Sequence, residues 1–87
     1  MEIIYSIKAL KDIAYWKRSG NIAVQKKISA LLNDIVAHPY SGLGKPEALK
    51  YQLSGSWSRR ITGVDRLVYR VNNDNNTIEI ETAQGHF

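Results

Sequence analysis

The side chains best suited to chemistry in this 87-residue sequence are concentrated in a short basic stretch at its centre. Residues 45–70 contain six Lys or Arg and two acidic side chains, a net charge of +4, whereas residues 71–87 contain three acidic side chains and no Lys or Arg. Guanidinium groups match phosphate oxygens with two hydrogen bonds at once, so a polyanion such as RNA is one candidate partner. The alternative is that the positive charge only keeps a small protein soluble.

Three segments of the second half alternate in residue type with period two, which is typical of half-buried strands. They are residues 57–62, 66–71 and 78–81. One face of the predicted sheet is apolar and needs a cover; it carries Ile61, Leu67, Tyr69, Val71, Ile78 and Ile80. The opposite face collects charged side chains, namely Arg60, Arg66, Arg70, Glu79 and Glu81.

Strand register decides whether two of these arginines become neighbours. A three-residue turn at 63–65, with Gly63 at a positive φ, would pair Thr62 with Arg66 and bring Arg60 close to Arg66. Such a pair repels unless an anion joins it, so one interpretation is a phosphate clamp. The other is a solvated face whose charge is balanced by nearby carboxylates, those of Glu47, Glu79 and Glu81. The alternation of residue types does not choose between the two.

The first half of the chain is predicted to supply the cover for the apolar face. Residues 2–6 have the β-branched and aromatic composition of a strand. Apolar residues then recur at helical spacing over 9–19, and again in a second helix that has Asn21 as its N-cap and is ended by Pro39. We therefore expect a single α+β domain over residues 1–87, with two N-terminal helices packed on one face of a mostly antiparallel sheet.

Several classes of protein and site are excluded by what the sequence lacks. There are no cysteines, which excludes disulfides and cysteine-based zinc sites. The Glu and His residues do not have the spacing of a helix-borne metal site, and we expect neither a metal nor another cofactor. The N-terminus has the pattern of neither a signal peptide nor a membrane span, so we expect a cytoplasmic protein with no membrane partner.

The blocks that resemble a known family are Gly44-Lys45-Pro46-Glu47 and Trp57-Ser58-Arg59-Arg60-Ile61, together with Tyr15-Trp16 and the closing His86-Phe87. They resemble the YoeB family of toxins within the RelE/ParE superfamily, and the similarity covers nearly the whole chain. The resemblance implies a small RelE-like domain with the fold of microbial ribonucleases. It also implies a toxin of a type II toxin–antitoxin system, an endoribonuclease that cuts messenger RNA in the ribosomal A site. The implied partners are the ribosome, a YefM-like antitoxin and a second copy of the chain in a homodimer.

The resemblance assigns catalytic roles to four residues. A ribonuclease that uses the 2′-hydroxyl of RNA as its nucleophile needs a base for that proton, an acid for the leaving 5′-oxygen and cations for the phosphorane. Glu47 matches the family's general base and His86 its general acid. Arg60 and Arg66 match its phosphate-binding arginines, and Arg66 is the stronger candidate for stabilising the transition state.

Four further residues are candidates for binding RNA. Lys45 and Lys50 flank Glu47 and would hold phosphates around it. Arg59 shares the apolar face of the sheet, so it is either structural or a contact to RNA or to the antitoxin. Phe87 stands where close relatives have tyrosine; its ring still permits base stacking, but any hydrogen bond or proton transfer by the hydroxyl is lost.

The position of His86 is the most demanding geometric requirement of this scheme. Strict alternation from Ile78 and Ile80 would place His86 on the helix-covered face, so a bulge or irregular end near residues 83–85 must redirect it. Two other functions stay open, the first of them because of Phe87. One is a non-catalytic basic module that binds RNA, the ribosome or the antitoxin and blocks translation by occupancy. The other is a degenerate toxin kept for binding its antitoxin.

Overall fold

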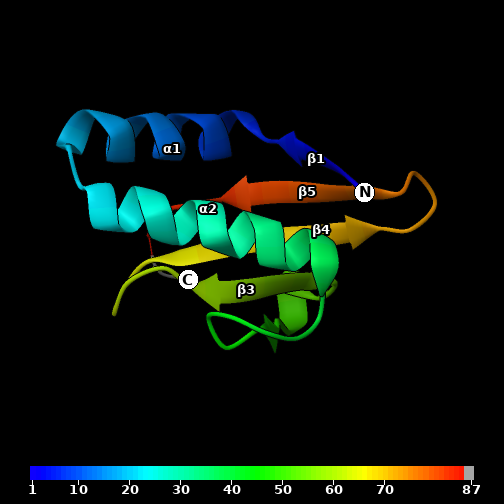
Figure 1. The fold of residues 1–87 in the computed structure, drawn as a ribbon. Coiled ribbons are helices and arrows are strands. Elements are labelled where there is room, and N and C mark those ends of the chain that lie inside the picture. Colours follow the sequence, from blue (N-terminus) through cyan, green and yellow to red (C-terminus); the bar gives the residue numbers. More distant parts are fainter. Residues whose placement is uncertain (86–87) are drawn as a thin grey trace.

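The computed structural model describes residues 1–85, which form two helices, five strands and one short 3₁₀ turn. In chain order these are β1 (Glu2–Tyr5), α1 (Ile7–Ser19), α2 (Ile22–Ala37), β2 (Glu47–Ala48), η1 (Tyr51–Leu53), β3 (Ser56–Arg60), β4 (Arg66–Asn72) and β5 (Thr77–Thr82). The sheet order is β1-β5-β4-β3-β2; β1 runs parallel to β5, and the other three pairs are antiparallel. Both helices lie on the same side of the sheet (Figure 1), so the predicted α+β class is confirmed.

Short polar residues fix the ends of both helices. The Ser6 hydroxyl accepts a hydrogen bond from the Ala9 N–H (2.9 Å) at the start of α1, and Gly20 ends that helix with a φ of 72°. Asn21 Oδ1 accepts from the Val24 N–H (3.1 Å) as the predicted N-cap of α2. These bonds satisfy backbone groups that a helix end leaves free, so capping residues mark helix ends in the sequence. The observed helix ends therefore agree closely with the predicted ones.

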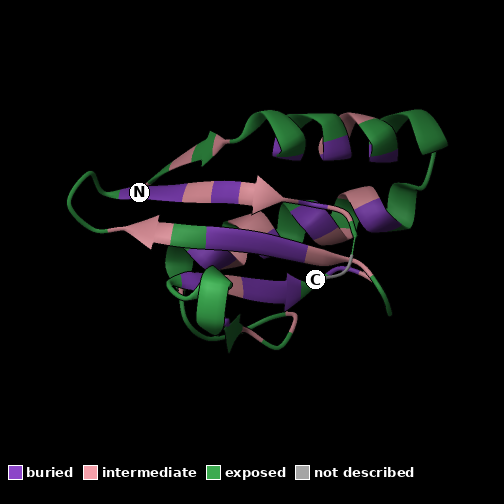
Figure 2. Cartoon of the chain, turned by 180° about the vertical axis from the view of Figure 1, so that it is seen from behind, coloured by how far each residue is buried: buried purple, intermediate pink, exposed green. Residues whose placement is uncertain are grey.

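The core fills the space between the helices and the covered face of the sheet. Leu31 of α2, Tyr69 of β4 and Ile78 of β5 have no exposed surface. The predicted apolar face is confirmed, because its members are either buried in this core or packed against it; they are Ile61, Leu67, Tyr69, Val71, Ile78 and Ile80. The opposite side of the sheet, which Figure 2 shows from the front, is not covered by either helix, and we call it the open face.

Part of the open face is nevertheless covered by the chain itself. The segment 49–55, which contains η1, folds back in front of the sheet (Figure 2). Ser56, Ser58 and Val68 beneath it are 1%, 2% and 6% exposed. Alternation predicted Ser58 and Val68 to be open, because a period-two pattern carries no information about a loop that returns over a strand.

The β3–β4 hairpin has a different register from the predicted one. Arg60 pairs directly with Arg66, whereas the prediction paired Thr62 with Arg66. The Thr62 hydroxyl accepts the Asp65 N–H (2.9 Å) and so shapes the turn, while Gly63 does not adopt a positive φ. The predicted turn was therefore wrong, but its consequence is confirmed: the two arginines lie opposite each other on one face.

A β-bulge inverts the alternation at the end of β5. The pairing of β4 with β5 shifts by one residue, which makes Glu81 the extra residue of the bulge. Ala83 is consequently fully buried in the core, although strict alternation from Ile80 would send it to the open face. An irregularity of the kind needed to redirect His86 thus exists, earlier than predicted. His86 itself lies outside the described residues.

A buried arginine joins β3 to α2 and to the loop before β2. Arg59 has no exposed surface and makes five hydrogen bonds, as many as a guanidinium has N–H donors. The acceptors are the Asp34 carboxylate, the Tyr69 hydroxyl and the backbone carbonyls of His38, Ser41 and Leu43. We call this set the Arg59 cluster. The prediction that Arg59 binds RNA is therefore wrong, because its guanidinium is enclosed and saturated; the structural alternative is correct.

The Arg59 cluster shifts the pKa values of two of its members. The hydrogen bond from Arg59, and after it the one from the Leu43 N–H, hold the pKa of the Asp34 carboxyl below its usual value of 3.8. Burial raises the pKa of the Tyr69 phenol, which donates a hydrogen bond to the Pro39 carbonyl (2.5 Å). At neutral pH both groups therefore keep the protonation state that their hydrogen bonds require.

Asp34 is expected to make the fold sensitive to acid. Because its folded-state pKa lies below the unfolded value, the unfolded chain binds the proton more tightly. The stabilisation by the carboxylate is thus complete above about pH 4 and is lost as the pH falls through the lower, folded-state pKa. We expect Asp34→Asn to be less stable at pH 7 and to lose less further stability below about pH 4 than the natural chain.

Urea-unfolding midpoints measured by circular dichroism from about pH 2 to 7 test this expectation. Asp74→Asn, in the exposed turn between β4 and β5, is the matched control and should retain the acid response of the natural chain. An undiminished acid response in Asp34→Asn would show that other groups cause it.

Candidate active site

Neighbouring strands place three of the predicted catalytic residues on the open face. Glu47 pairs with Ser58, and Arg60, two residues further along β3, points to the same side as Ser58. Arg60 in turn pairs with Arg66 of β4. Residues two positions apart on a strand are about 7 Å apart and paired residues about 5 Å, distances that long side chains span. The structure therefore brings Glu47, Arg60 and Arg66 together.

Neither arginine of this group has a carboxylate partner within residues 1–85. The ion pairs of this part of the chain are Lys8–Asp12, Asp34–Arg59 and Arg70–Glu81. Arg60 is exposed, and the Arg66 guanidinium donates to the carbonyls of Thr62 (3.3 Å) and Asp65 (3.2 Å), which orient it without neutralising its charge. Within the described residues, both cations thus remain available to an anion.

The carboxylates that were candidates for balancing this charge mostly have other partners. Glu81 accepts the Ser56 hydroxyl (2.5 Å) and lies 3.8 Å from Arg70 Nε. Glu79 accepts the side-chain amide of Asn72 (3.3 Å). These contacts favour the phosphate-clamp interpretation of the open face over that of a charge-balanced surface.

Gly44 holds the loop that carries Lys45 and Glu47 against β3. Its carbonyl accepts the Arg60 N–H (2.7 Å), and its φ is 77°. A Cβ at this position would lie 2.8 Å from Leu31 Cδ2 and 3.2 Å from the Arg60 nitrogen. Glycine is therefore required both for the backbone conformation and for the close approach to β3, which explains the first residue of the Gly-Lys-Pro-Glu block.

A cavity of about 310 Å³ adjoins Glu47 at the β2 edge of the sheet. Its lining consists of Glu47, Ala48, Leu49, Lys50, Tyr51 and Leu53. The side chains of Lys45, Glu47 and Lys50 are all exposed. The carboxylate predicted to act as the base is thus accessible from solvent and is flanked by two lysines.

The end of the chain is tied to α1 by a buried carboxylate that the sequence reading missed. Asp12, 6% exposed, accepts the Ala83 N–H (2.9 Å), and Trp16 Nε1 donates to the Ala83 carbonyl (2.8 Å). Asp12 is not among the site residues predicted from the sequence. Its spacing, three residues after Ala9 and four before Trp16, was the available signal, because that spacing puts all three on one helix face.

Gly85, the last described residue, is held beside Arg66. Its N–H donates to Asp65 Oδ1 (2.9 Å), and its carbonyl accepts the Arg66 N–H (3.1 Å). A second cavity of about 250 Å³ borders this segment and is lined by Lys8, Leu53, Val68, Glu81, Thr82, Gln84 and Gly85. His86 and Phe87, the predicted acid and stacking residue, lie outside the described residues.

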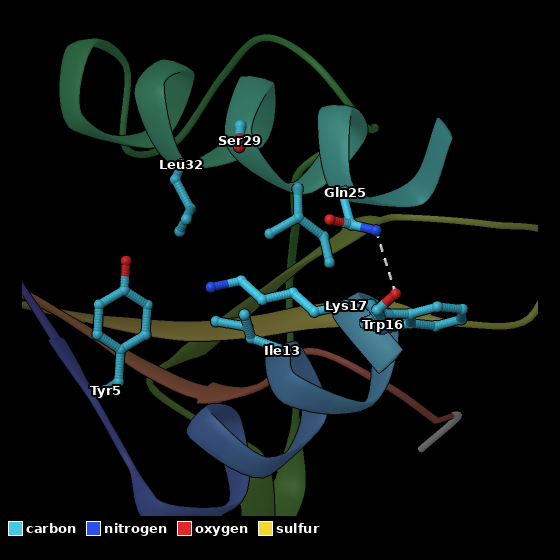
Figure 3. A pocket seen from close by; sticks show the side chains of 8 residues that line it. Tyr5, Ile13, Trp16, Lys17, Gln25, Ser29 and Leu32 are labelled. Atoms are coloured by element: carbon cyan, nitrogen blue, oxygen red, sulfur yellow. Dashed lines mark hydrogen bonds between the residues drawn. The ribbon is translucent and has the colours of Figure 1, made fainter. Parts of the chain in front are cut away.

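A third cavity, of about 220 Å³, lies between the two helices (Figure 3). Its lining consists of Tyr5, Ile13, Trp16, Lys17, Gln25, Ile28, Ser29 and Leu32, none of them a predicted site residue. Within residues 1–85 no three His, Asp or Glu side chains gather as metal ligands would, and no helix there has the length and apolarity to span a membrane. The candidate chemistry is therefore concentrated on the open face.

The sequence is similar to known toxins along its whole length. The family whose sequence model matches residues 5–87 is described as YoeB-like toxin of bacterial type II toxin-antitoxin system. The chain is 47% identical to Toxin YoeB of Escherichia coli strain K12 over 74 residues, which cover 85% of this chain and 87% of that protein. It is 42% identical to Toxin YoeB of Streptomyces coelicolor over 87 residues, with both chains fully covered.

The fold is similar to solved toxin structures. The YoeB/ParE toxin from Agrobacterium tumefaciens matches with a TM-score of 0.95 at 34% identity, covering 100% of both chains. A chain of the heterotetrameric YoeB-YefM toxin–antitoxin complex from Staphylococcus aureus matches with a TM-score of 0.87 at 38% identity, covering 100% of this chain and 98% of that one. The YoeB dimer from Staphylococcus aureus matches with a TM-score of 0.88, at the same identity and coverage.

Glycine-to-alanine substitutions are expected to separate backbone strain from steric contact. Gly63→Ala should be nearly neutral, because Gly63 has no positive φ and no atom within 4 Å of the added Cβ. Gly20→Ala adds the strain of a φ of 72° in open space. Gly44→Ala adds both strain and the contacts described above, so we expect it to lose about 1–3 kcal/mol more than Gly63→Ala.

Urea unfolding of the three variants measures this order, with Gly44→Ala the least stable and Gly63→Ala the most stable. If Gly44→Ala were as stable as Gly20→Ala, the contacts of the added Cβ at position 44 would have no cost in the free energy of unfolding.

Proposed function

The chain belongs to the YoeB family of bacterial type II toxins, and we propose that it is a ribosome-dependent endoribonuclease that cuts messenger RNA in the ribosomal A site. The observation that carries the proposal is the shared open face of Glu47, Arg60 and Arg66. A carboxylate beside two arginines that lack carboxylate partners within residues 1–85 suits an RNA phosphodiester better than a neutral substrate.

The proposed reaction uses the nucleophile that RNA itself carries. The Glu47 carboxylate takes the proton of the 2′-hydroxyl, whose oxygen attacks the adjacent phosphorus and forms a 2′,3′-cyclic phosphate. The bond from phosphorus to the 5′-oxygen breaks, and His86 donates a proton to that leaving oxygen. Arg60 and Arg66 bind the non-bridging oxygens, whose negative charge grows in the phosphorane. The two proton transfers balance, and no step requires a cofactor.

The role of His86 is supported by the attachment of its covalent neighbour. Gly85, which precedes His86 in the sequence, contacts both Asp65 and Arg66 through its backbone. A histidine suits this role because its imidazole titrates near neutral pH and is readily recharged. We propose it as the acid on this basis.

Three other residues complete the proposed site. Lys45 and Lys50 lie on either side of Glu47 along the chain and would bind phosphates next to the scissile one. Phe87 would stack on a base, which needs only the face of an aromatic ring. Its missing hydroxyl removes a donor that a tyrosine would supply, so we expect slower cleavage than in relatives that end in His-Tyr.

The proposal includes protein partners as well as RNA. The similar Staphylococcus aureus toxin occurs in a heterotetrameric YoeB-YefM complex and as a YoeB dimer. By analogy, we propose that a YefM-like antitoxin neutralises this chain and that the chain forms a homodimer. Because the proposed substrate is a message on the translating ribosome, the proposed activity is cytoplasmic.

Substitutions of the proposed catalytic residues are expected to abolish cleavage without unfolding the protein. Glu47→Gln removes the base, and Arg66→Ala removes a preorganised donor, a change that typically costs about 10²–10³ in rate. His86→Ala removes the acid. Ribosomes programmed with a defined message, followed by primer extension, report new RNA 5′ ends at the A-site codon.

Glu79→Gln is the matched control, because Glu79 lies on the same face and its carboxylate accepts a hydrogen bond from the Asn72 side-chain amide. Arg18→Ala, in the last turn of α1, is the control for loss of a cation. Full cleavage by a triple variant at 47, 66 and 86 would refute the site. Arrest of translation by the natural chain without new 5′ ends would support the occupancy function that the terminal phenylalanine leaves open.

A further inference from the structure

Tyr51 is the most exposed large apolar side chain in the described part of the protein. Its exposed fraction is 90%, whereas that of Ile7, the next in order, is 74%. Its backbone φ is +58°, in the left-handed region that residues other than glycine rarely adopt. Neither core packing nor backbone preference accounts for a tyrosine here, and strained residues of this kind concentrate at functional sites.

The loop that carries Tyr51 is held in place from both ends. The Leu49 N–H donates to the Ser56 carbonyl (2.9 Å) and closes the base of the loop, and the Ser54 N–H donates to the Tyr51 carbonyl (3.0 Å). Arg70 Nη2 donates to the Ser54 carbonyl (3.4 Å) from the sheet. The ring is therefore presented from a fixed backbone, so little backbone freedom remains to be lost when a ligand binds.

Tyr51 also shares a cavity with two groups that fit the rest of a nucleotide. It lines the space of about 310 Å³ together with Glu47 and Lys50. An aromatic face suits a base, and an ammonium group suits a phosphate. The cavity borders the open face at Glu47, which lines the cavity and pairs with Ser58 in the sheet. An aromatic ring, a cation and the proposed base thus lie along one edge.

We propose that Tyr51 is the stacking platform for an unpaired RNA nucleobase next to the scissile phosphate. The inference rests on the ribonuclease function proposed above and deepens it by naming a base subsite. A base on this ring lies at the β2 edge, and its phosphodiester then runs past Glu47 toward Arg60 and Arg66. Since every base has a π-face, the subsite accepts all four bases and discriminates little among them.

Cleavage kinetics on programmed ribosomes test the subsite. Tyr51→Phe keeps the ring and should keep the natural KM, whereas Tyr51→Leu and Tyr51→Gly should raise KM by roughly 5- to 150-fold with a much smaller change in kcat. Ile7→Ala, on α1, is the control for loss of an exposed apolar side chain and should change neither constant. An unchanged KM in Tyr51→Leu overturns the proposal.

Thermal unfolding separates a ligand-binding role from a structural one. Glycine adopts a φ of +58° without strain, so Tyr51→Gly should melt at the same temperature as the natural chain or higher, although it binds RNA more weakly. If Tyr51 had a purely structural role, Tyr51→Gly would melt at a lower temperature than the natural chain. If the melting temperatures of Tyr51→Gly and Tyr51→Leu fall in step with their activity, the subsite is refuted.

A direct binding measurement distinguishes failure of the subsite from failure of the cleavage proposal. A single-stranded RNA oligonucleotide containing 2-aminopurine, whose fluorescence is quenched by stacking, is titrated with Glu47→Gln in combination with each Tyr51 variant. Quenching that requires an aromatic ring at 51 supports the subsite even if the natural chain cuts no message. Equal quenching by the Tyr51→Leu variant overturns the subsite. So does a Tyr51 variant that loses antitoxin binding while its RNA quenching is unchanged, because Tyr51 would then be an antitoxin contact.

Discussion

The saturated guanidinium of Arg59 is the interaction on which the rest of the structure depends. A buried cation is costly unless its charge is paired and its donors are all satisfied. Here α2 supplies the carboxylate of Asp34, β4 supplies the Tyr69 hydroxyl and the loop before β2 supplies three carbonyls. Movement of any of these elements would leave the others with unpaired polar groups. The loop that leads to Glu47 is therefore fixed, although it has almost no regular secondary structure.

The sequence alone predicted the features that depend on local periodicity. Helical spacing and short polar caps defined α1 and α2, because each cap satisfies donors within three residues of itself. Period-two alternation assigned Arg59 to the covered face and Arg60 to the open one. That assignment separated two adjacent arginines with opposite roles. It also put Arg66 on the same face as Arg60, since every hairpin whose paired residue numbers have an even sum gives that result.

The features that sequence analysis missed depend on contacts between distant segments. The two-residue strand β2 has too few residues to show a period. It is held against β3 by backbone hydrogen bonds of Gly44 and Leu49, one on either side of it. The return of the loop 49–55 over the sheet leaves no pattern in the strands that it covers. The sequence pattern does not reveal the bulge at Glu81 either, because the bulge is set by the pairing of β5 with β4.

The open face combines segments that are far apart in the chain, and polar contacts join them in addition to apolar packing. Gly44 fixes the approach to Glu47, Asp12 fixes Ala83, and Asp65 fixes Gly85 beside Arg66. Hydrophobic burial is non-directional, and a chain of 87 residues has a small core, so directional hydrogen bonds must set these positions. The same requirement explains the two kinds of arginine here. A guanidinium is structural where acceptors of the protein surround it, as at 59. At 60 and 66 the part of the chain that the structure describes supplies too few acceptors, and the remaining donors are left for an anion from outside.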